Sequence, residues 1–416
     1  MSALFRRENL ILFAILLFAV AVRIAGVGYG LPLWLIDDEP AFTLAALKMI
    51  QLKTLFPAAH FEEFKSVLYY PPYLSYFYLP FFIVYLAVQF LFFDGTREQF
   101  MNYLVSDLSG FFIIVRVLHA FLAAASVWLV YRVGKTIFRE TRAGLAAAFL
   151  LATSILHISL SPNGRHWPPV AFIMALGFFI LTRESWSYKK RYFWSALLAG
   201  LGMGVSVMAG FLGLFMVMHY LFVERRGVAA LLRDWFSYAI LAMFGFLAWL
   251  PKWLYPGSYG FGVDVTSGDP KTLMGALAAP FLFLKPILVS EPVLALLLII
   301  GLIFSFRSAR SWFWASGLFI VAYSLAFYQF FRFEHRFVLG LYPLLAVIAG
   351  YGLVCLWQSV GVLRLRSAGL VAIGIIIIFQ VTAASRLGYL MYRGDSRSLA
   401  REWAEENMQA GSKVLV

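Results

Sequence analysis

The chain alternates between long apolar runs and short polar segments. Most of the runs are long enough, at about 1.5 Å of rise per helical residue, to approach the roughly 30 Å of hydrocarbon in a bilayer. Because backbone groups in lipid must be hydrogen-bonded internally, runs of this length predict helices. We therefore expect an all-α, polytopic integral membrane protein with about 11 transmembrane helices. The runs cover 10–33, 69–93, 111–133, 143–160, 168–182, 193–222, 235–251, 286–306, 312–331, 337–357 and 368–391.

Composition supports this class. Apolar residues make up 62% of the 416 residues and charged residues 13%, whereas soluble domains are near half apolar and about a quarter charged. The net charge of +13 lies in short clusters between apolar runs, so we expect the lipid bilayer, and no nucleic acid, as the partner of these charges. Cys355 is the only cysteine, which rules out a disulfide or a cysteine-based metal site within one chain.

The basic clusters predict the topology. Arg6 and Arg7 precede the first run, which we interpret as a retained helix, and they place the N-terminus in the cytoplasm. The later clusters should be cytoplasmic too, with the active site and the C-terminus external, in a membrane that we expect to be a prokaryotic plasma membrane. These clusters are Arg132–Arg142, Arg183–Arg191, Arg225–Arg233, Arg307 with Arg310, and Arg364 with Arg366.

Simple alternation of crossings conflicts with these clusters at two runs. We expect 69–93, which is rich in tyrosine and contains Pro80, to lie obliquely in the outer leaflet without crossing. We expect 193–222 to enter and return, broken at its glycines, with a turn near 208–210.

The predicted domain organisation follows from this topology. A transmembrane domain covers 1–391, with a first external loop at 34–110 and a later one at 252–285. Short external turns lie at 161–167 and 332–336. Residues 392–416 form an external tail, which we interpret as the possible start of a further soluble domain.

Two adjacent carboxylates, Asp38 and Glu39, follow the first run on the external side. A carboxylate there can accept a proton from a hydroxyl nucleophile or coordinate a divalent cation. The alternative is a pair of solvated loop acids. The following residues 41–55 predict an amphipathic helix on the membrane surface.

Cations also gather on the external side, where Lys and Arg are normally scarce. Arg332, His335 and Arg336 stand between two apolar runs, and an anionic partner such as a phosphate would offset their cost in the membrane. Arg165 could hold the same anion, and Trp167 could stack on a sugar. The alternative is that these side chains only snorkel to lipid headgroups.

Other polar residues sit within apolar runs. Arg23 and Arg116 are embedded near the outer ends of their helices, and Glu291 with Pro292 marks a broken helix end. We expect the isolated histidines to be packed or hydrogen-bonded within the bundle and not to bind metal; they are His119, His157 and His219.

The order of several motifs resembles a known superfamily. An external Asp-Glu after the first run is followed by Tyr-Pro-Pro at 70–72 and by VRVLHAFLAAASVWLVYRVGKTIF at 115–138. AGLAAAFLLATSILHISLSPNGR at 143–165 and HRFVLGLYPLLAVIAGYGL at 335–353 come next. This order, over nearly the whole chain, resembles the GT-C superfamily, in particular the glycosyltransferase family 39-like branch of protein O-mannosyltransferases and lipid A aminoarabinose transferases.

The resemblance implies an inverting hexosyl or pentosyl transferase that uses a polyprenyl-phosphate-linked sugar as co-substrate. The acceptor would be a hydroxyl of a protein, lipid or glycan at the outer membrane face. The resemblance leaves open a role for a divalent metal, for which Asp38 and Glu39 are the only candidate ligands. The residues that the resemblance implies are Asp38 with Glu39 as the catalytic acids and Arg336, with His335 and Arg332 nearby, for the donor phosphate. From the residues themselves we add Arg165 for the phosphate, and Trp167, Tyr255, Tyr259 and Tyr70 as contacts of the sugar or the acceptor.

Two alternatives remain from the sequence. A transporter of a lipid-linked substrate would carry charges on broken helices at the membrane midplane. A non-catalytic subunit of a membrane complex could retain the fold, and Trp167 and Met208 favour it, because relatives often have Asp and Lys at these places.

Overall fold

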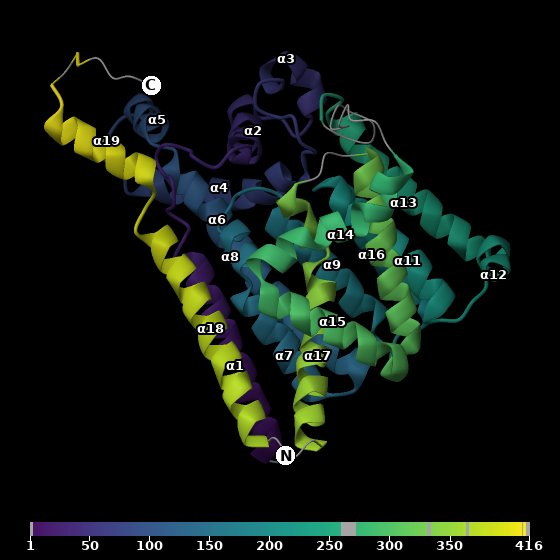
Figure 1. Cartoon of the computed structure of the whole chain (residues 1–416). Helices are drawn as coiled ribbons and strands as arrows, with labels where there is room; N and C mark the ends of the chain where they lie inside the picture. Colours follow the sequence, from purple (N-terminus) through teal and green to yellow (C-terminus); the bar gives the residue numbers. More distant parts are fainter. Residues whose placement is uncertain (1–2, 259–271, 331–333, 363–365, 410, 413–416) are drawn as a thin grey trace.

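The computed structural model describes residues 3–258, 272–330, 334–362, 366–409 and 411–412 (Figure 1). Helices are the only regular elements among these residues. Seven helices of the described chain are long and apolar enough to cross a membrane, and shorter apolar helices accompany them. The expected all-α polytopic class is thus confirmed.

The helices follow one another with few long connections. In chain order they are α1 (Ala3–Ile24), α2 (Glu39–Leu52), η1 (Pro57–His60), α3 (Phe61–Phe64), α4 (Tyr73–Leu91), α5 (Arg97–Ser106), α6 (Ser109–Phe138), α7 (Thr141–Thr153), α8 (Ile155–Leu160), α9 (Trp167–Leu181), α10 (Tyr188–Met203), α11 (Val207–Phe222), α12 (Val228–Arg233), α13 (Trp235–Leu254), α14 (Leu273–Ser290), α15 (Pro292–Ser308), α16 (Arg310–Phe330), η2 (His335–Gly340), α17 (Tyr342–Val362), α18 (Arg366–Tyr392) and α19 (Ser396–Asn407).

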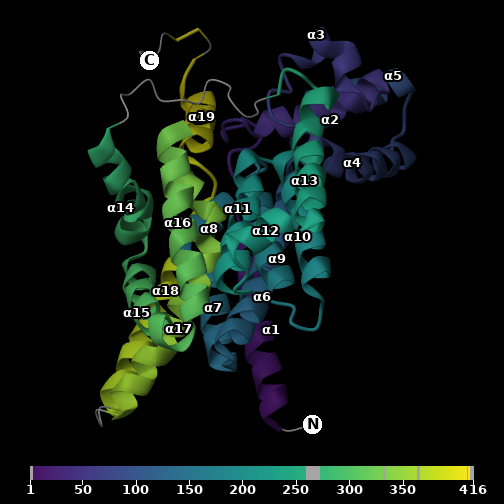
Figure 2. The ribbon, with the colours of Figure 1, turned by 90° about the vertical axis from the view of Figure 1, so that its right-hand side faces the viewer.

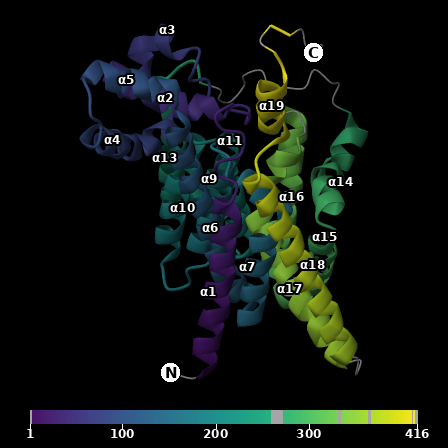
Figure 3. The same cartoon turned by 90° about the vertical axis from the view of Figure 1, so that its left-hand side faces the viewer.

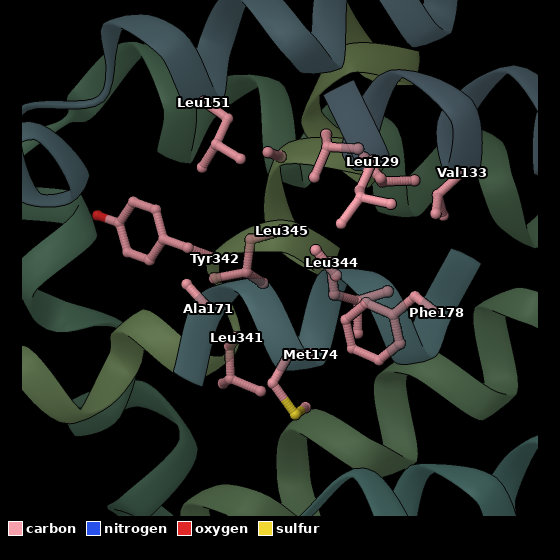
Figure 4. Close-up of a cluster of buried hydrophobic side chains, with 14 of the residues drawn as sticks. Leu129, Val133, Leu151, Ala171, Met174, Phe178, Leu341, Tyr342, Leu344 and Leu345 are labelled. Carbon is pink, nitrogen blue, oxygen red and sulfur yellow. The ribbon is translucent and has the colours of Figure 1, made fainter. Parts of the chain in front are cut away.

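The core of the bundle lies between α6, α7, α9 and α17, whose apolar side chains turn toward one another (Figure 4). Helix α15 packs closely on α17 because glycines stand at the contact. A Cβ at Gly301 would lie 2.0 Å from the Ile348 carbonyl oxygen, and one at Gly352 would lie 2.1 Å from that of Leu297. Without a hydrophobic drive between helices in lipid, such close backbone contact is a main source of helix association.

The bundle has two distinct ends. One, here called the loop face, carries α2 to α5 and the C-terminal helix α19; the other, here called the basic face, holds the N-terminal end of α1 (Figures 1 and 3). Lys135 lies 3.8 Å from Glu8, so the end of α6 belongs to the basic face. Connections near 183–191, 219–225 and 307–312 line one cavity together with 136–139, which places them at the same end. Which face is cytoplasmic stays a prediction from the basic residues.

Helix α4 lies across the bundle end, roughly perpendicular to α1 and α6 (Figures 2 and 3). The Tyr73 amide at its start donates to the carbonyl of Gly204, in a turn of the loop face, at 3.1 Å. Its inner side packs on α2 and α6. Although α4 has the length and composition of a spanning helix, its placement agrees with the expectation that 69–93 does not cross.

The run 193–222 forms two antiparallel helices, α10 and α11, as expected, but the predicted turn near 208–210 is wrong. The chain turns at 204–206, where Ser206 accepts from the Met208 amide and caps α11. A Cβ at Gly204 would lie 2.1 Å from the Tyr73 ring, whereas Gly210 is inside α11. The break therefore lies where α4 approaches.

Two other predicted boundaries need correction, whereas the helix break expected at Glu291 is confirmed, between α14 and α15. The run 143–160 is broken at Ser154, between α7 and α8. The loop predicted at 252–285 is shorter, because α13 ends at Leu254 and α14 begins at Leu273. The tail contains α19, and 413–416 lie outside the described residues.

The placement of α4 predicts a labelling pattern. In a variant whose buried Cys355 is replaced by alanine, single cysteines at the exposed positions Ser66 and Asp94 should react with a membrane-impermeant maleimide from the same side. A cysteine at exposed Arg142, on the basic face, is the control for the opposite side. Labelling of positions 66 and 94 from opposite sides would show that α4 crosses the membrane.

Candidate functional site

Asp38 and Glu39 stand at the N-terminal end of α2, at the loop face. Asp38 is the N-cap residue and has a left-handed backbone, with φ 62° and ψ −10°, a conformation that Asp and Asn tolerate better than most residues. Glu39 begins the helix. The Glu39 side chain is fully buried, whereas that of Asp38 is 21% exposed. The two adjacent acids therefore have different surroundings.

Glu39 forms a two-pronged ion pair with Arg116 of α6. The Arg116 Nε and Nη2 atoms donate to the two Glu39 carboxylate oxygens at 2.7 and 2.6 Å, and both side chains are fully buried. Arg116 Nη1 also donates to the carbonyls of Val27 and Tyr29, beyond the end of α1. This pair joins α1, α2 and α6 at the loop face.

The same carboxylate holds the turn at 161–166. The Gly164 amide donates to Glu39 Oε1 at 2.9 Å. A Cβ at position 164 would lie 2.5 Å from that oxygen, so only glycine permits the approach. His119, three residues after Arg116, bonds the Asn163 carbonyl at 2.8 Å and the Tyr78 hydroxyl at 2.7 Å. The turn and α4 are thus both tied to α6.

Asp38 is surrounded by three donors. The hydroxyls of Tyr69 and Tyr70 donate to its two oxygens at 3.2 and 2.9 Å, and Arg165 forms an ion pair with it. Burial, together with the Asp38 charge, raises the pKa of both tyrosines, so they stay protonated and remain donors. The carboxylate is held in a fixed orientation at the edge of a partly exposed site.

Two arginines share the ring of Trp167, the first residue of α9. The guanidinium carbons of Arg165 and Arg336 each lie 5.4 Å from the centre of that ring. Arg336 is also paired with Glu334, and its side chain is 31% exposed. Arg165 and Arg336, far apart in the sequence, are therefore brought to the same indole ring, and Arg165 also contacts Asp38.

Buried ring nitrogens lie in the same place. The indole nitrogen of Trp167 and Nδ1 of His166 are buried with no hydrogen-bond partner among the described residues. Burial and the charges of Arg165 and Arg336 hold the pKa of His166 well below its usual range, so the ring is neutral. Its ring packs against Phe42, Tyr70 and Trp167. Unpaired buried polar atoms of this kind call for an explanation, and a bound ligand is one.

Of the other predicted residues, the structure places Tyr255 against the first loop and leaves His335 exposed next to Arg336, and two are not described. Tyr255 is 1% exposed and stacks on Phe61 of the first loop, so it anchors that loop instead of lining an open site. His335 is exposed at the start of η2. Tyr259 and Arg332 lie outside the described residues.

Sequence reasoning missed the partner of Arg116. An arginine within a long apolar helix is costly unless it is paired, and Glu39 was available on the same side of the predicted membrane. This signal predicts an acidic partner for Arg116, and the structure shows that the partner is Glu39 and not Asp38. We therefore give Glu39 a positioning role and keep Asp38 as the candidate catalytic acid.

The two acids do not form a metal site as they stand. Asp38 is paired with Arg165 and Glu39 with Arg116, so cations already occupy both carboxylates. No group of three or more His, Cys, Asp or Glu side chains that could hold a metal ion occurs in the described part of the chain. The donor set around Asp38 suits an anion better than a divalent cation.

Comparisons with known proteins bear on this arrangement. Residues 98–255 match the family model of dolichyl-phosphate-mannose-protein mannosyltransferases. The structure of an oligosaccharyltransferase from Archaeoglobus fulgidus, in complex with an inhibitory peptide and a dolichol-phosphate, aligns with 99% of this chain at a TM-score of 0.57. The apo form aligns with 97% at 0.55, and identity is 15% in both. The chain has the GT-C fold.

The GT-C fold confirms the resemblance noted from the sequence. This chain spans 58–59% of the length of the archaeal oligosaccharyltransferase. No curated protein matches the sequence itself. The segment matched by the family model includes α6, α9 and the turn that carries Arg165, so it contains both the buried pair's arginine and part of the Asp38 cluster.

The buried ion pair between Glu39 and Arg116 predicts that removing only one of the two charges destabilises the fold. Replacing Glu39 by Gln leaves the Arg116 charge buried and uncompensated, which costs about 3–5 kcal/mol. Thermal unfolding of the purified protein in detergent should show a large loss for this variant. The isosteric Asp37→Asn change, at an exposed neighbour, should alter stability by no more than about 0.5 kcal/mol.

The double variant Glu39→Gln, Arg116→Gln removes both charges and should be more stable than Glu39→Gln alone. Equal melting temperatures for wild type and Glu39→Gln would contradict the structural role of the pair.

Proposed function

We propose that the protein is a membrane glycosyltransferase that moves a sugar from a polyprenyl-phosphate donor to an acceptor hydroxyl, with inversion at the anomeric carbon. The active site is the loop face, and Asp38 is the general base. By the distribution of basic residues, the loop face is external and the basic face cytoplasmic, in a prokaryotic plasma membrane. The acceptor is a hydroxyl of a protein, lipid or glycan.

One observation carries this proposal: two guanidinium groups share the Trp167 ring, and one of them, Arg165, is paired with a fixed carboxylate. Asp38 is held by Tyr69, Tyr70 and Arg165, and Arg165 and Arg336 flank the same indole ring. Transfer from a glycosyl phosphate needs a base for the nucleophile and cations for the leaving phosphate. The cluster supplies both within one site.

The reaction proceeds as a single displacement. The acceptor oxygen forms a bond to the anomeric carbon while its proton passes to a carboxylate oxygen of Asp38. The bond from that carbon to the phosphate oxygen breaks, and the polyprenyl phosphate leaves with the electron pair. Attack opposite to the leaving group inverts the anomeric centre.

The arginines act on the leaving group. A guanidinium presents planar, two-pronged donors that match phosphate oxygens. As negative charge grows on the phosphate, Arg336 and Arg165 stabilise it in a site partly closed to water. The nitrogens of His166 and Trp167 that are buried without a partner in the described residues are further candidate contacts for such a ligand. Tyr70 is partly exposed and offers an aromatic surface for the sugar or the acceptor. Trp167 is only 1% exposed, and its ring contacts the two arginines instead.

The comparisons support a lipid-phosphate donor. The matched family model is that of dolichyl-phosphate-mannose-protein mannosyltransferases. The archaeal enzyme of the same fold was solved in complex with a dolichol-phosphate and an inhibitory peptide. These are properties of those proteins, and they favour, for this chain, a donor carried on a polyprenyl phosphate and a protein acceptor.

The transporter alternative predicts charges lining a path at helix breaks. Glu291 does lie at a break, between α14 and α15. It accepts from the Ser154 hydroxyl at 2.7 Å, from the Leu156 amide at 2.9 Å and from the Tyr342 hydroxyl at 3.3 Å. Glu291 thus links the break between α14 and α15 to the break between α7 and α8. This favours a structural role for Glu291, and therefore an enzyme over a transporter.

Removal of the proposed base tests the chemistry. Asp38→Asn keeps the shape and tolerates the left-handed backbone, but it cannot take the proton. Transfer measured with a panel of radiolabelled polyprenyl-phosphate sugars should fall by roughly 10²–10⁴-fold. Donor binding should be largely retained, because the base is needed only as the nucleophile forms.

Asp37→Asn, at the exposed neighbouring acid, is the matched control and should turn over at nearly the wild-type rate. Near-normal transfer by Asp38→Asn would remove Asp38 from the mechanism. Donor binding by wild-type protein without any transfer would favour a non-catalytic subunit of a membrane complex.

Substitution of Arg336 tests the phosphate site. Arg336→Lys keeps the charge but loses the two-pronged geometry, so it should bind a short-chain polyprenyl-phosphate sugar more weakly than wild type. Arg336→Ala should lose more, on the order of 2–5 kcal/mol of binding free energy. Binding is measured on purified protein in detergent. Equal affinities of the three proteins would mean that Arg336 only reaches lipid headgroups, and the phosphate would then be assigned to Arg165.

A further inference from the structure

A second polar site lies at the basic face, at the opposite end of the bundle from Asp38. A cavity of about 510 Å³ opens among the ends of α6, α9, α11 and α15 and the starts of α10 and α16. Its volume lies within the roughly 300–1,000 Å³ typical of ligand pockets. Segments from four distant parts of the chain contribute to its wall.

The wall is strongly cationic. Five arginines line the cavity, and Glu184 is the one acid among the lining residues. Arg191 is paired with Glu224 at 2.9 Å. The other four arginines are exposed and make no ion pair with any carboxylate of the described chain; they are Arg139, Arg225, Arg307 and Arg310. Positively charged side chains that face one cavity repel each other unless an anion lies between them.

A buried histidine in the same wall has an open hydrogen-bonding position. His219 is fully buried, and its Nδ1 is bonded to the Tyr192 hydroxyl at 2.7 Å. Its Nε2 is buried without a partner in the described residues. When the Tyr192 hydroxyl donates to Nδ1, Nε2 carries the proton and is a donor. This nitrogen is a second, independent indication of a ligand.

The remaining lining residues distinguish the kind of anion. Apolar side chains line the cavity together with the arginines, among them Ile137, Phe138, Val223 and Trp312. The Trp312 ring packs edge-on against the His219 ring, with 5.1 Å between the ring centres. A free inorganic anion needs no apolar wall, whereas a lipid brings its glycerol and first acyl carbons with its phosphate. Basic pockets among the cytoplasmic ends of transmembrane helices are a known setting for lipid headgroups.

We infer that this cavity binds the phosphate headgroup of an acidic phospholipid at the basic face. The general excess of arginine on cytoplasmic loops explains basic residues at this end. It does not explain why four unpaired arginines and an unpartnered histidine surround one cavity. The site is separate from the loop face, so this inference does not rest on the proposed transfer reaction.

The test compares two double variants of the full chain with equal loss of charge. Arg307→Gln with Arg310→Gln removes two lining cations. Arg142→Gln with Lys189→Gln removes two exposed cations near the same face that do not line the cavity. All four positions are exposed, so both proteins should fold, which size-exclusion chromatography and circular dichroism will check.

Binding is measured by native mass spectrometry of the purified protein in detergent, with phosphatidylglycerol as the probe. Phosphatidylcholine with the same acyl chains is the neutral control. The Arg307 and Arg310 double variant should bind phosphatidylglycerol about 10- to 30-fold more weakly than wild type. The Arg142 and Lys189 double variant should bind as wild type does. His219→Phe, which removes the buried nitrogen, should also weaken binding.

Three outcomes overturn the inference. An equal loss of phosphatidylglycerol binding in both double variants would mean that total charge, and not this cavity, determines the binding. Equal binding of phosphatidylglycerol and phosphatidylcholine by wild type would remove the selectivity for an acidic headgroup. Displacement of phosphatidylglycerol by millimolar inorganic phosphate would assign the cavity to a soluble phosphate instead of a lipid.

Discussion

The buried ion pair between Glu39 and Arg116 is the interaction on which the loop face depends. It joins the start of α2 to α6, and the remaining donors and acceptors of the two side chains hold the end of α1 and the turn before α9. Desolvating two charges is expensive, and only good geometry with further hydrogen bonds offsets it. Here both conditions are met, so four chain segments share one fixed point. Asp38 and Arg165 of the candidate site stand on two of these segments, the start of α2 and the turn before α9.

Because the ion pair fixes the start of α2, the adjacent acids Glu39 and Asp38 point in different directions. Glu39 faces the protein and holds it together, while Asp38 faces the site and is partly exposed. Arg165 is one residue from Gly164, so the turn held by Glu39 also sets the position of the cation on Asp38. In the proposed function, Glu39 and Gly164 position the site, and their neighbours Asp38 and Arg165 take part in the chemistry.

The sequence was informative where hydrophobic pattern and charge sign decide the structure. The placement of α4 and the return of α10 and α11 followed from counting basic clusters, because lipid permits few alternatives. Tertiary contacts decided what the pattern could not. The turn that we predicted near 208–210 lies at Gly204, against which the Tyr73 ring packs. Tyr255, which we expected in the site, stacks on Phe61. The cost of a buried arginine predicts a carboxylate partner for Arg116, but choosing between two adjacent acids requires the direction of each side chain.

The left-handed backbone of Asp38 has a consequence for comparing related chains. At φ 62° a longer or branched side chain is strained, whereas Asn and Gly are accommodated. A descendant that lost the carboxylate but kept the fold would therefore drift to Asn or Gly at this position more readily than to Glu. The residue at this one place thus separates chains that retain an acid from chains that retain only the scaffold, and it does so without any measurement of activity.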